Sequence, residues 1–112
     1  MVAIYVPERG DLAWINFDPQ AGREQAKNRP ALVLTGSDFN AATGLLIVCP
    51  VTRTERPWRT RVPLVGTATA GSVMIEQLES IDWSARGAAF IERVPLSLLD
   101  DVKSRVATML DL

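Results

Sequence analysis

The sequence contains no histidine, and this absence removes several kinds of catalytic site. General acid–base catalysis by an imidazole, a Ser-His-Asp triad and most zinc sites all need histidine. The chain has one cysteine, Cys49, which cannot form an internal disulfide and lies in an apolar run where a buried thiol is expected. No group of carboxylates has the spacing of a metal site, so we expect chemistry that uses no metal and no cofactor.

Long apolar runs are absent as well. The longest, residues 45–51, is too short to cross a bilayer, and the N-terminus lacks a basic segment followed by an apolar one. We therefore expect a cytoplasmic protein that does not enter a membrane. Of the 112 residues, 47% are hydrophobic and 22% are charged, and these values predict one globular domain over residues 1–112.

The net charge of −1 hides an uneven distribution of charge along the chain. Residues 23–61 contain seven basic and three acidic residues, which is a net charge of +4. Residues 76–112 contain seven acidic and four basic residues, which is a net charge of −3. A basic middle segment of this kind is compatible with a local groove that binds phosphate.

Short apolar segments separated by glycine, proline and polar residues predict a mainly β protein. Pro50 predicts that the last residues of its strand leave regular pairing. After Pro95, apolar residues at helical spacing predict an amphipathic C-terminal helix packed on a compact curled sheet or barrel, an α+β fold. The expected strands cover residues 12–17, 31–34, 45–51, 62–65, 72–78, 80–83 and 88–92, residues 36–40 are expected to form a turn with at most one helical turn, and the helix face comprises Leu99, Val102, Val106, Met109 and Leu110.

The first candidate site is Arg29, which follows a long polar loop and stands at the start of the second expected strand. Pro30 favours an extended conformation for Arg29. A guanidinium held there suits an anion, because arginine offers a rigid fork of donors that matches phosphate. The alternative is a surface arginine that pairs with Glu24.

The second candidate site is the loop of residues 53–61, in which four arginines surround Trp58. An exposed tryptophan can stack on an unpaired base while neighbouring guanidiniums hold phosphate, as in proteins that bind single strands. The alternative, equally open, is that Trp58 folds back onto the core.

Four blocks of the sequence resemble the MazF/PemK-type toxins, small endoribonucleases of bacterial toxin–antitoxin pairs. The blocks are GDLAWINFDP at 10–19, EQA at 24–26 with RPA at 29–31, PVT at 50–52, and QLESIDW at 77–83 with ARG at 85–87. The resemblance runs from residue 5 to the last helix and implies a small SH3-like barrel related to the CcdB fold. It also implies a homodimer and a MazE-like antitoxin whose tail lies in the groove that takes single-stranded RNA.

The resemblance further implies which residues act on RNA. Arg29 and Thr52 match the family's catalytic pair, in which Thr52 would donate its hydroxyl to a phosphate oxygen and Arg29 would hold the phosphate. Because arginine is a poor base near neutral pH, Glu24 would orient Arg29 or accept the proton. Attack by the 2′-hydroxyl without a metal would leave a 2′,3′-cyclic phosphate and a 5′-hydroxyl. The residues expected to bind RNA are Arg23, Lys27, Asn28, Arg53, Arg56, Trp58, Arg59, Gln77, Ser80 and Arg86.

Two positions depart from the family's pattern. Asn28 stands where members often have histidine, and asparagine cannot shuttle a proton, so the general base stays open. Arg53 follows Thr52 where members often have threonine or serine, which predicts a different base preference. In the fourth block, structural roles are the alternative, with Ser80 capping a turn and Arg86 pairing with Asp82.

Two other functions compete with the nuclease. A CcdB-like toxin binds and poisons DNA gyrase and cuts nothing, and an inactive module would keep only the fold and the antitoxin contact. The presence of Arg29 and Thr52 favours the nuclease, because a toxin that only binds protein needs no such pair. Because the histidine is missing, the inactive module stays an alternative.

Overall fold

The computed structural model describes residues 4–17 and 28–112. Its strands are β1 (Asp11–Asn16), β2 (Asn28–Val33), β3 (Leu45–Thr52), β4 (Arg61–Pro63), β5 (Ser72–Met74), β6 (Glu79–Asp82) and β7 (Ala88–Arg93). Its helices are α1 (Ser37–Thr43), the 3-10 turn η1 (Ile75–Gln77), α2 (Trp83–Arg86) and α3 (Leu96–Leu110). None of the helices in the described ranges is long and apolar enough to cross a membrane.

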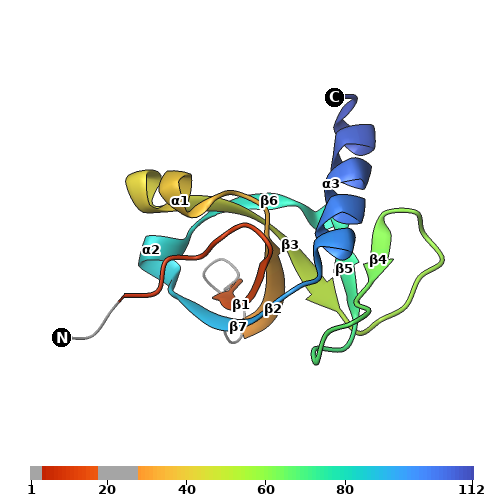
Figure 1. Cartoon of the computed structure of the whole chain (residues 1–112), viewed down its shortest axis with the longest axis horizontal. Helices are drawn as coiled ribbons and strands as arrows, with labels where there is room; N and C mark the ends of the chain where they lie inside the picture. Colours follow the sequence, from red (N-terminus) through yellow and green to blue (C-terminus); the bar gives the residue numbers. More distant parts are fainter. Residues whose placement is uncertain (1–3, 18–27) are drawn as a thin grey trace, which may run out of the picture.

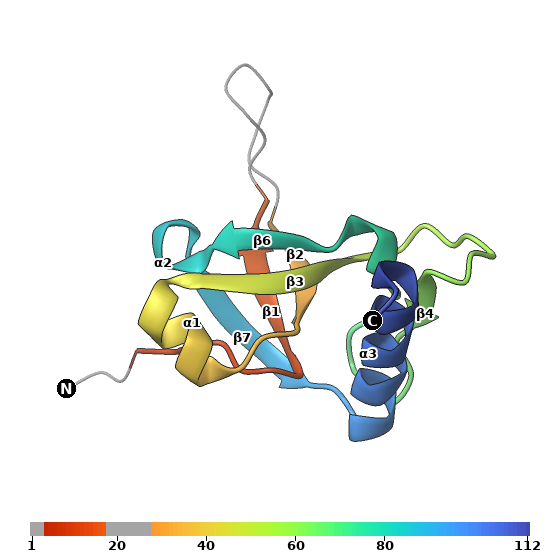
Figure 2. The same cartoon turned by 90° about the horizontal axis from the view of Figure 1, so that it is seen from above.

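All strand pairs are antiparallel, in the order β4-β5-β3-β2-β1-β7, and β6 also pairs with β3. The central strand β3 has β2 on one edge, and on its other edge β6 and β5 follow one another along the strand. The sheet curls strongly, with α1 and α2 at one end of the molecule and α3 and β4 at the other (Figures 1 and 2). The expected curled antiparallel sheet with a C-terminal helix is confirmed, but the sheet does not close into a barrel.

Alternating residues of the strands build two cores on the two faces of the sheet. The first core contains Leu12, Leu32 and Cys49, and α3 covers it with Leu99 and Val102. The second core lies on the opposite face and is built from Ala13, Ile15, Ala31, Val33, Leu46, Val48 and Ile81. Burial raises the pKa of the Cys49 thiol to about 12, so the cysteine is a protonated core residue as expected.

Both prolines of the inner strands lie inside regular structure, which corrects two expectations. Strand β2 begins at Asn28 and passes through Pro30, because it pairs with β1 there but pairs with β3 only from Ala31 onward. The expectation for Pro50 is wrong, since Val51 and Thr52 continue in the sheet by pairing with β5. Pro50 occupies the gap between the β6 and β5 pairings of β3, where a missing N–H costs no ladder bond on that edge.

Four further elements differ from the sequence prediction. Helix α1 has seven residues because Asn40 is fully buried and its amide donates to the carbonyls of Pro7 and Thr35, contacts distant in sequence that outweigh local propensity. The segment expected as a strand at 72–78 divides into β5 and η1. The strand expected at 80–83 ends at Asp82, and Trp83 begins α2. In α3 the expected face packs as far as Val106, whereas Met109 and Leu110 are exposed.

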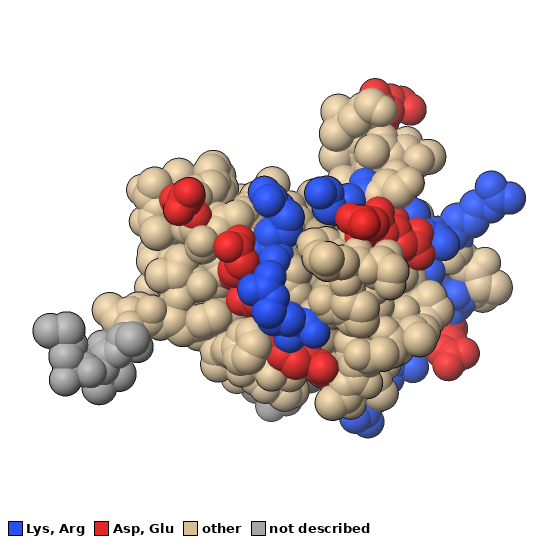
Figure 3. All heavy atoms as spheres, in the orientation of Figure 1, with Lys and Arg blue, Asp and Glu red and all other residues tan. Residues whose placement is uncertain are grey.

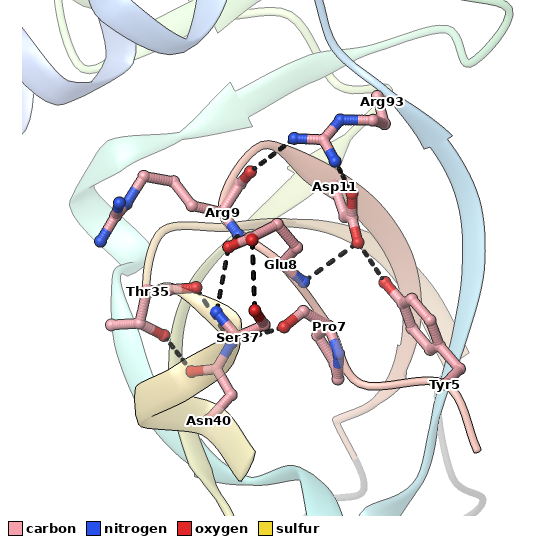
Figure 4. A network of polar contacts seen from close by, with 9 residues as sticks. All are labelled: Tyr5, Pro7, Glu8, Arg9, Asp11, Thr35, Ser37, Asn40 and Arg93. Atoms are coloured by element: carbon pink, nitrogen blue, oxygen red, sulfur yellow. Dashed lines mark hydrogen bonds and ion pairs between the residues drawn. The ribbon is translucent and has the colours of Figure 1, made fainter. Parts of the chain in front are cut away.

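A polar network joins the N-terminal segment to α1 and β7 (Figure 4). The Tyr5 hydroxyl donates to Asp11 Oδ2 at 2.7 Å, and burial together with this bond raises the pKa of Tyr5. Arg93 of β7 pairs with Asp11, and Glu8 accepts hydrogen bonds from the backbone N–H and hydroxyl of Ser37. These bonds fix the start of β1, the strand that pairs with β2 through Arg29.

Candidate functional site

The strand register brings Arg29 and Thr52 together. Strands β2 and β3 pair from Val33 opposite Val48 to Ala31 opposite Pro50. Continued for two residues, the same register places Arg29 opposite Thr52, with both side chains on the face of the second core. Two residues that are 23 positions apart in the sequence therefore end adjacent strands side by side.

The Thr52 hydroxyl is oriented by a hydrogen bond from the backbone. Thr52 Oγ1 accepts a hydrogen bond from the Thr54 backbone N–H at 3.1 Å. Because a hydroxyl is both acceptor and donor, this bond orients the oxygen and leaves its O–H for another group. Thr52 is half-buried at the end of β3, at the edge of the exposed loop that follows.

The row of side chains continues beyond Thr52 to β5 and β4. Ser72 pairs directly with Thr52, and Pro63 pairs with Ser72. We call Arg29, Thr52, Ser72 and Pro63 the cross-strand row. Ser72 is a member that sequence reasoning missed, because its place beside Thr52 depends on a pairing between β3 and β5 that the sequence does not specify.

Gly71 permits the close approach of β5 to Thr52. Its φ is +129°, and a Cβ at this position would lie 2.6 Å from the Thr52 carbonyl oxygen and 2.9 Å from Val51 Cγ1. Such contacts are shorter than side chains allow, so only glycine fits without a shift. The β4–β5 hairpin is therefore fitted tightly against the end of β3.

Glu92 on β7 holds the tip of the same hairpin. Its carboxylate accepts hydrogen bonds from the backbone N–H groups of Ala68 and Thr69 at 3.0 and 2.8 Å and from the Thr69 hydroxyl at 2.6 Å. The hydrogen bond from the Thr69 side chain, followed by that from Ala68, lowers the pKa of Glu92. The hairpin is thus fixed at both ends.

The loop between β3 and β4 carries the second group of predicted residues. Arg53, Arg56 and Arg59 are exposed, and basic side chains gather at this end of the molecule in Figure 3. Trp58 does not fold into the core: its side chain is 48% exposed, and the Arg61 guanidinium lies 4.7 Å from its ring centroid. Cation–π contact of this kind holds the indole while leaving the rest of its surface accessible.

Arg61, the first residue of β4, anchors this loop. Its Nε donates to Glu76 Oε2 at 2.7 Å, and its Nη1 donates to the Thr54 carbonyl at 3.2 Å. Burial raises the pKa of Glu76, but the polar groups of Thr60 and Arg61 and the backbone lower it by more, so the net shift is downward. The loop is therefore anchored to η1 through an ion pair that is mostly shielded from solvent.

A cavity of about 670 Å³ lies between this loop and the β4–β5 hairpin. We call it the hairpin pocket. Its walls include the loop residues Arg53, Glu55 and Arg56 and the hairpin residues Pro63, Leu64 and Ser72. Ser72 belongs to both the pocket and the cross-strand row, so the pocket opens beside Thr52.

A second cavity, of about 320 Å³, lies near the other predicted residues Asn28 and Arg86, with Trp14 on its wall. Arg86 donates to the Asn16 carbonyl at 3.1 Å, so it does not make the alternative pair with Asp82. Asp82 instead caps α2, and the hydrogen bonds from the Ser84 hydroxyl and the Ala85 N–H lower its pKa. This cavity adjoins the β1 and β2 ends that carry Arg29.

Two predicted residues lie apart from the cross-strand row. Ser80 is exposed in β6 opposite Ile47, which the alternation along β3 places on the face away from Thr52, and it lies in a strand and not in a turn. Gln77 is exposed at the end of η1. The predicted residues Arg23, Glu24 and Lys27 lie outside the described residues.

The part of the chain that the structure describes contains no group of three or more histidine, cysteine, aspartate or glutamate side chains arranged to hold a metal ion. The polar groups that the strand register brings to these strand ends are the Arg29 guanidinium and the hydroxyls of Thr52 and Ser72. These are donors suited to an anionic oxygen such as that of a phosphate.

Comparison with known proteins places this chain in a family. Residues 8–110 match the family described as PemK-like, MazF-like toxin of type II toxin-antitoxin system. The chain is 37% identical to the endoribonuclease toxin MazF of Escherichia coli strain K12 over 110 residues, which cover 98% of this chain and 99% of the relative. It is 41% identical to the endoribonuclease PemK of Escherichia coli over 108 residues, covering 92% of this chain and 81% of PemK.

A solved structure supports the same placement. The crystal structure of MazE-MazF (Form-II) from Deinococcus radiodurans matches with a TM-score of 0.91 and 37% sequence identity, over 97% of this chain and 99% of that chain. Sequence and fold therefore agree over nearly the whole length. The chain belongs to the PemK-like, MazF-like toxins of type II toxin–antitoxin systems.

Proposed function

We propose that this protein is an endoribonuclease toxin that cuts single-stranded RNA at a short sequence without a metal ion. The observation that supports the proposal most is the β2–β3 register, which, continued for two residues beyond Ala31 and Pro50, sets Arg29 opposite Thr52. Relatives that align with 98% and 92% of this chain are endoribonucleases. The pair provides the groups needed to stabilise charge on a phosphate undergoing attack.

The proposed reaction begins with attack of the ribose 2′-hydroxyl on the adjacent phosphorus. Negative charge then grows on the non-bridging oxygens, where the Thr52 O–H donates and the Arg29 guanidinium binds. As the 2′-hydroxyl loses its proton to a base, the bond to the 5′-oxygen breaks and that oxygen takes up a proton from solvent, leaving a 2′,3′-cyclic phosphate and a 5′-hydroxyl. Because arginine is a poor base near neutral pH, Glu24 is the proposed group that orients Arg29 or accepts the proton of the 2′-hydroxyl.

The exposed loop after Thr52 is proposed to hold the rest of the RNA. Arg53, Arg56 and Arg59 provide positive charge for the phosphates, and Trp58 offers the exposed part of its ring to a base. Single-stranded RNA fits this arrangement because an indole can stack only on a base that is not enclosed in a duplex.

The proposed partners follow from the family. The structures of MazE-MazF from Deinococcus radiodurans are of a toxin with its antitoxin, and we propose a MazE-like antitoxin for this chain. An acidic extended segment of the antitoxin would complement the charge of the basic loop between β3 and β4 of this chain. We also propose that two copies of this chain form a homodimer and that the protein acts in the cytoplasm.

The experiment maps the cut sites in a mixed-sequence RNA for the wild type, Arg29→Ala and Thr52→Ala. Loss of a single transition-state donor costs about 10²–10³ in kcat, so each variant should lose cleavage by at least that factor while its circular dichroism spectrum is unchanged. Thr52→Ser keeps the hydroxyl and should recover most of the activity. Wild-type rates in Arg29→Ala or Thr52→Ala would refute this site.

A further inference from the structure

The hairpin pocket lies beside the position that the proposed function gives to the scissile phosphate. Ser72 is paired with Thr52 in the sheet, and directly paired residues on one face have their Cβ atoms about 4.5–5.5 Å apart. Ser72 also forms part of the pocket wall. A phosphate held by Arg29 and Thr52 is therefore within one nucleotide of the pocket, on the side of the row away from β2.

The chemistry of the walls matches the parts of a nucleotide. Arg53 and Arg56 provide guanidiniums for a phosphate, and Pro63 and Leu64 provide apolar surface for the face of a base. Glu55 is an acidic side chain in this otherwise basic wall. A carboxylate is an acceptor only, so it pairs with the amino group of a base and repels a carbonyl oxygen at the same place.

The charges that face the pocket are not neutralised by one another. The three ion pairs among residues 4–17 and 28–112 involve Arg61, Arg93 and Arg105 and leave out Glu55, Arg53 and Arg56. Arg61 is the remaining cation of the pocket wall, and its ion pair with Glu76 fixes its position there.

The hairpin wall of the pocket is built before any ligand arrives. Gly71 sets the hairpin against the end of β3, and Glu92 holds the hairpin tip through Ala68 and Thr69. The cavity of about 670 Å³ lies within the range of small-ligand sites, about 300–1,000 Å³. A preformed wall loses little entropy on binding, which favours affinity for a ligand in the pocket.

We infer that the hairpin pocket binds the nucleotide that adjoins the scissile phosphate and selects a base with an exocyclic amino group through Glu55, with Ser72 contacting the same nucleotide. The inference rests on the proposed endoribonuclease function and adds a specificity site to it. It makes Glu55 the residue that discriminates against uracil at one position of the cleavage sequence, because uracil carries no amino group.

The experiment measures relative kcat/KM for every base at each position around the cut in a randomised RNA, using full-length protein. In the wild type, one position next to the cut should disfavour uracil. Glu55→Gln should reduce that discrimination by roughly 5- to 100-fold, the range for a base contact of this type. Ser72→Ala should lower kcat/KM roughly threefold to tenfold, the effect of one hydrogen bond. Ser104→Ala and Asp38→Asn make comparable changes on exposed parts of α3 and α1 and should leave both quantities unchanged.

The outcomes separate this inference from the function on which it rests. If the wild type cuts no RNA, the endoribonuclease proposal fails and this inference fails with it. If the wild type cuts at a sequence that Arg29→Ala abolishes, but Glu55→Gln and Ser72→Ala keep the same base profile and rate, the pocket inference alone is overturned. It is also overturned if the two variants leave cleavage unchanged and weaken binding of an acidic antitoxin peptide, because the pocket then serves the protein partner.

Discussion

Replacing Gly71 by alanine tests how closely the β4–β5 hairpin is fitted to Thr52. The new Cβ would lie 2.6 Å from the carbonyl oxygen of Thr52. This oxygen belongs to the backbone, so it cannot move away as the end of a flexible side chain could. The backbone at Gly71 also has φ of +129°, which an L-residue with a Cβ rarely adopts. The substitution therefore adds a steric clash to conformational strain.

The two contributions have separate magnitudes. Strained backbone at a residue other than glycine costs about 1–3 kcal/mol. Forcing an extra carbon into a packed place costs about 1–3 kcal/mol more. Gly71→Ala should therefore lower the free energy of unfolding by about 2–6 kcal/mol, which for a domain of this size lowers Tm by roughly 8–24 °C.

Two other glycines serve as matched controls. Gly87 has φ of +84° with no atom within 4 Å of its added Cβ, so Gly87→Ala should show the strain alone, about 1–3 kcal/mol. Gly36 has φ of −75°, and its nearest contact would be 3.5 Å, so Gly36→Ala should stay within about 1 kcal/mol of wild type.

The assay is thermal unfolding of the three variants, followed by RNA cleavage at a temperature where all of them are folded. Because the clash displaces the end of β3, Gly71→Ala should also lower kcat, whereas Gly36→Ala should keep the wild-type rate. Equal stabilities for Gly71→Ala and Gly36→Ala would refute the close packing. Wild-type kcat in Gly71→Ala would refute the link between the hairpin and Thr52.

Further expectations concern Glu92 and the loop between β3 and β4. Glu92→Gln should flatten the dependence of stability on pH, because the pKa of Glu92 is lowered in the folded state. A carboxylate of this kind contributes stability at pH values above its ordinary pKa of about 4.3, and this stability is lost as the pH falls through the folded-state pKa. Urea unfolding between pH 6 and pH 3 measures the change. Arg56→Ala should make the slope of log binding constant against log salt shallower by about 0.7, one phosphate contact to a single strand, and an unchanged slope would remove Arg56 from the RNA site. Trp58→Ala should weaken binding to single-stranded RNA by about 1–3 kcal/mol in fluorescence anisotropy, and equal affinity would leave its role to the contact with Arg61.

Much of the fold follows from local patterns in the sequence. The apolar run at 45–51 and the helical spacing of Leu99, Val102 and Val106 identify β3 and α3, because each pattern matches one secondary-structure period. The extent of α1 does not follow, because it depends on Asn40 bonding with Pro7, which is 33 residues away. Likewise, the fact that Pro50 lies inside a regular strand does not follow from local patterns, because it depends on where the pairings of β6 and β5 with β3 end.

The candidate site divides in the same way. Arg29 and Thr52 are candidates from the sequence because they match the family's motif, and continuing the β2–β3 register by two residues places them opposite each other. Ser72 and Gly71 have no signal of this kind, since their importance arises from the pairing of β5 with β3. Arg61 and Trp58 show a different limit of the sequence. The sequence places both in one basic loop, whereas the structure gives them different roles, since Arg61 is bonded to Glu76 and Trp58 keeps an exposed ring.

The central claim is that the donors at the ends of β2 and β3 cleave RNA without a metal. The most direct measurement incubates the purified protein with mixed-sequence RNA in EDTA and determines the chemistry of the new ends. The account predicts cuts at one short motif with 2′,3′-cyclic phosphate and 5′-hydroxyl ends, absent in Arg29→Ala. RNA that stays intact in EDTA but is cut when magnesium is added, or ends that carry a 5′-phosphate, would contradict it.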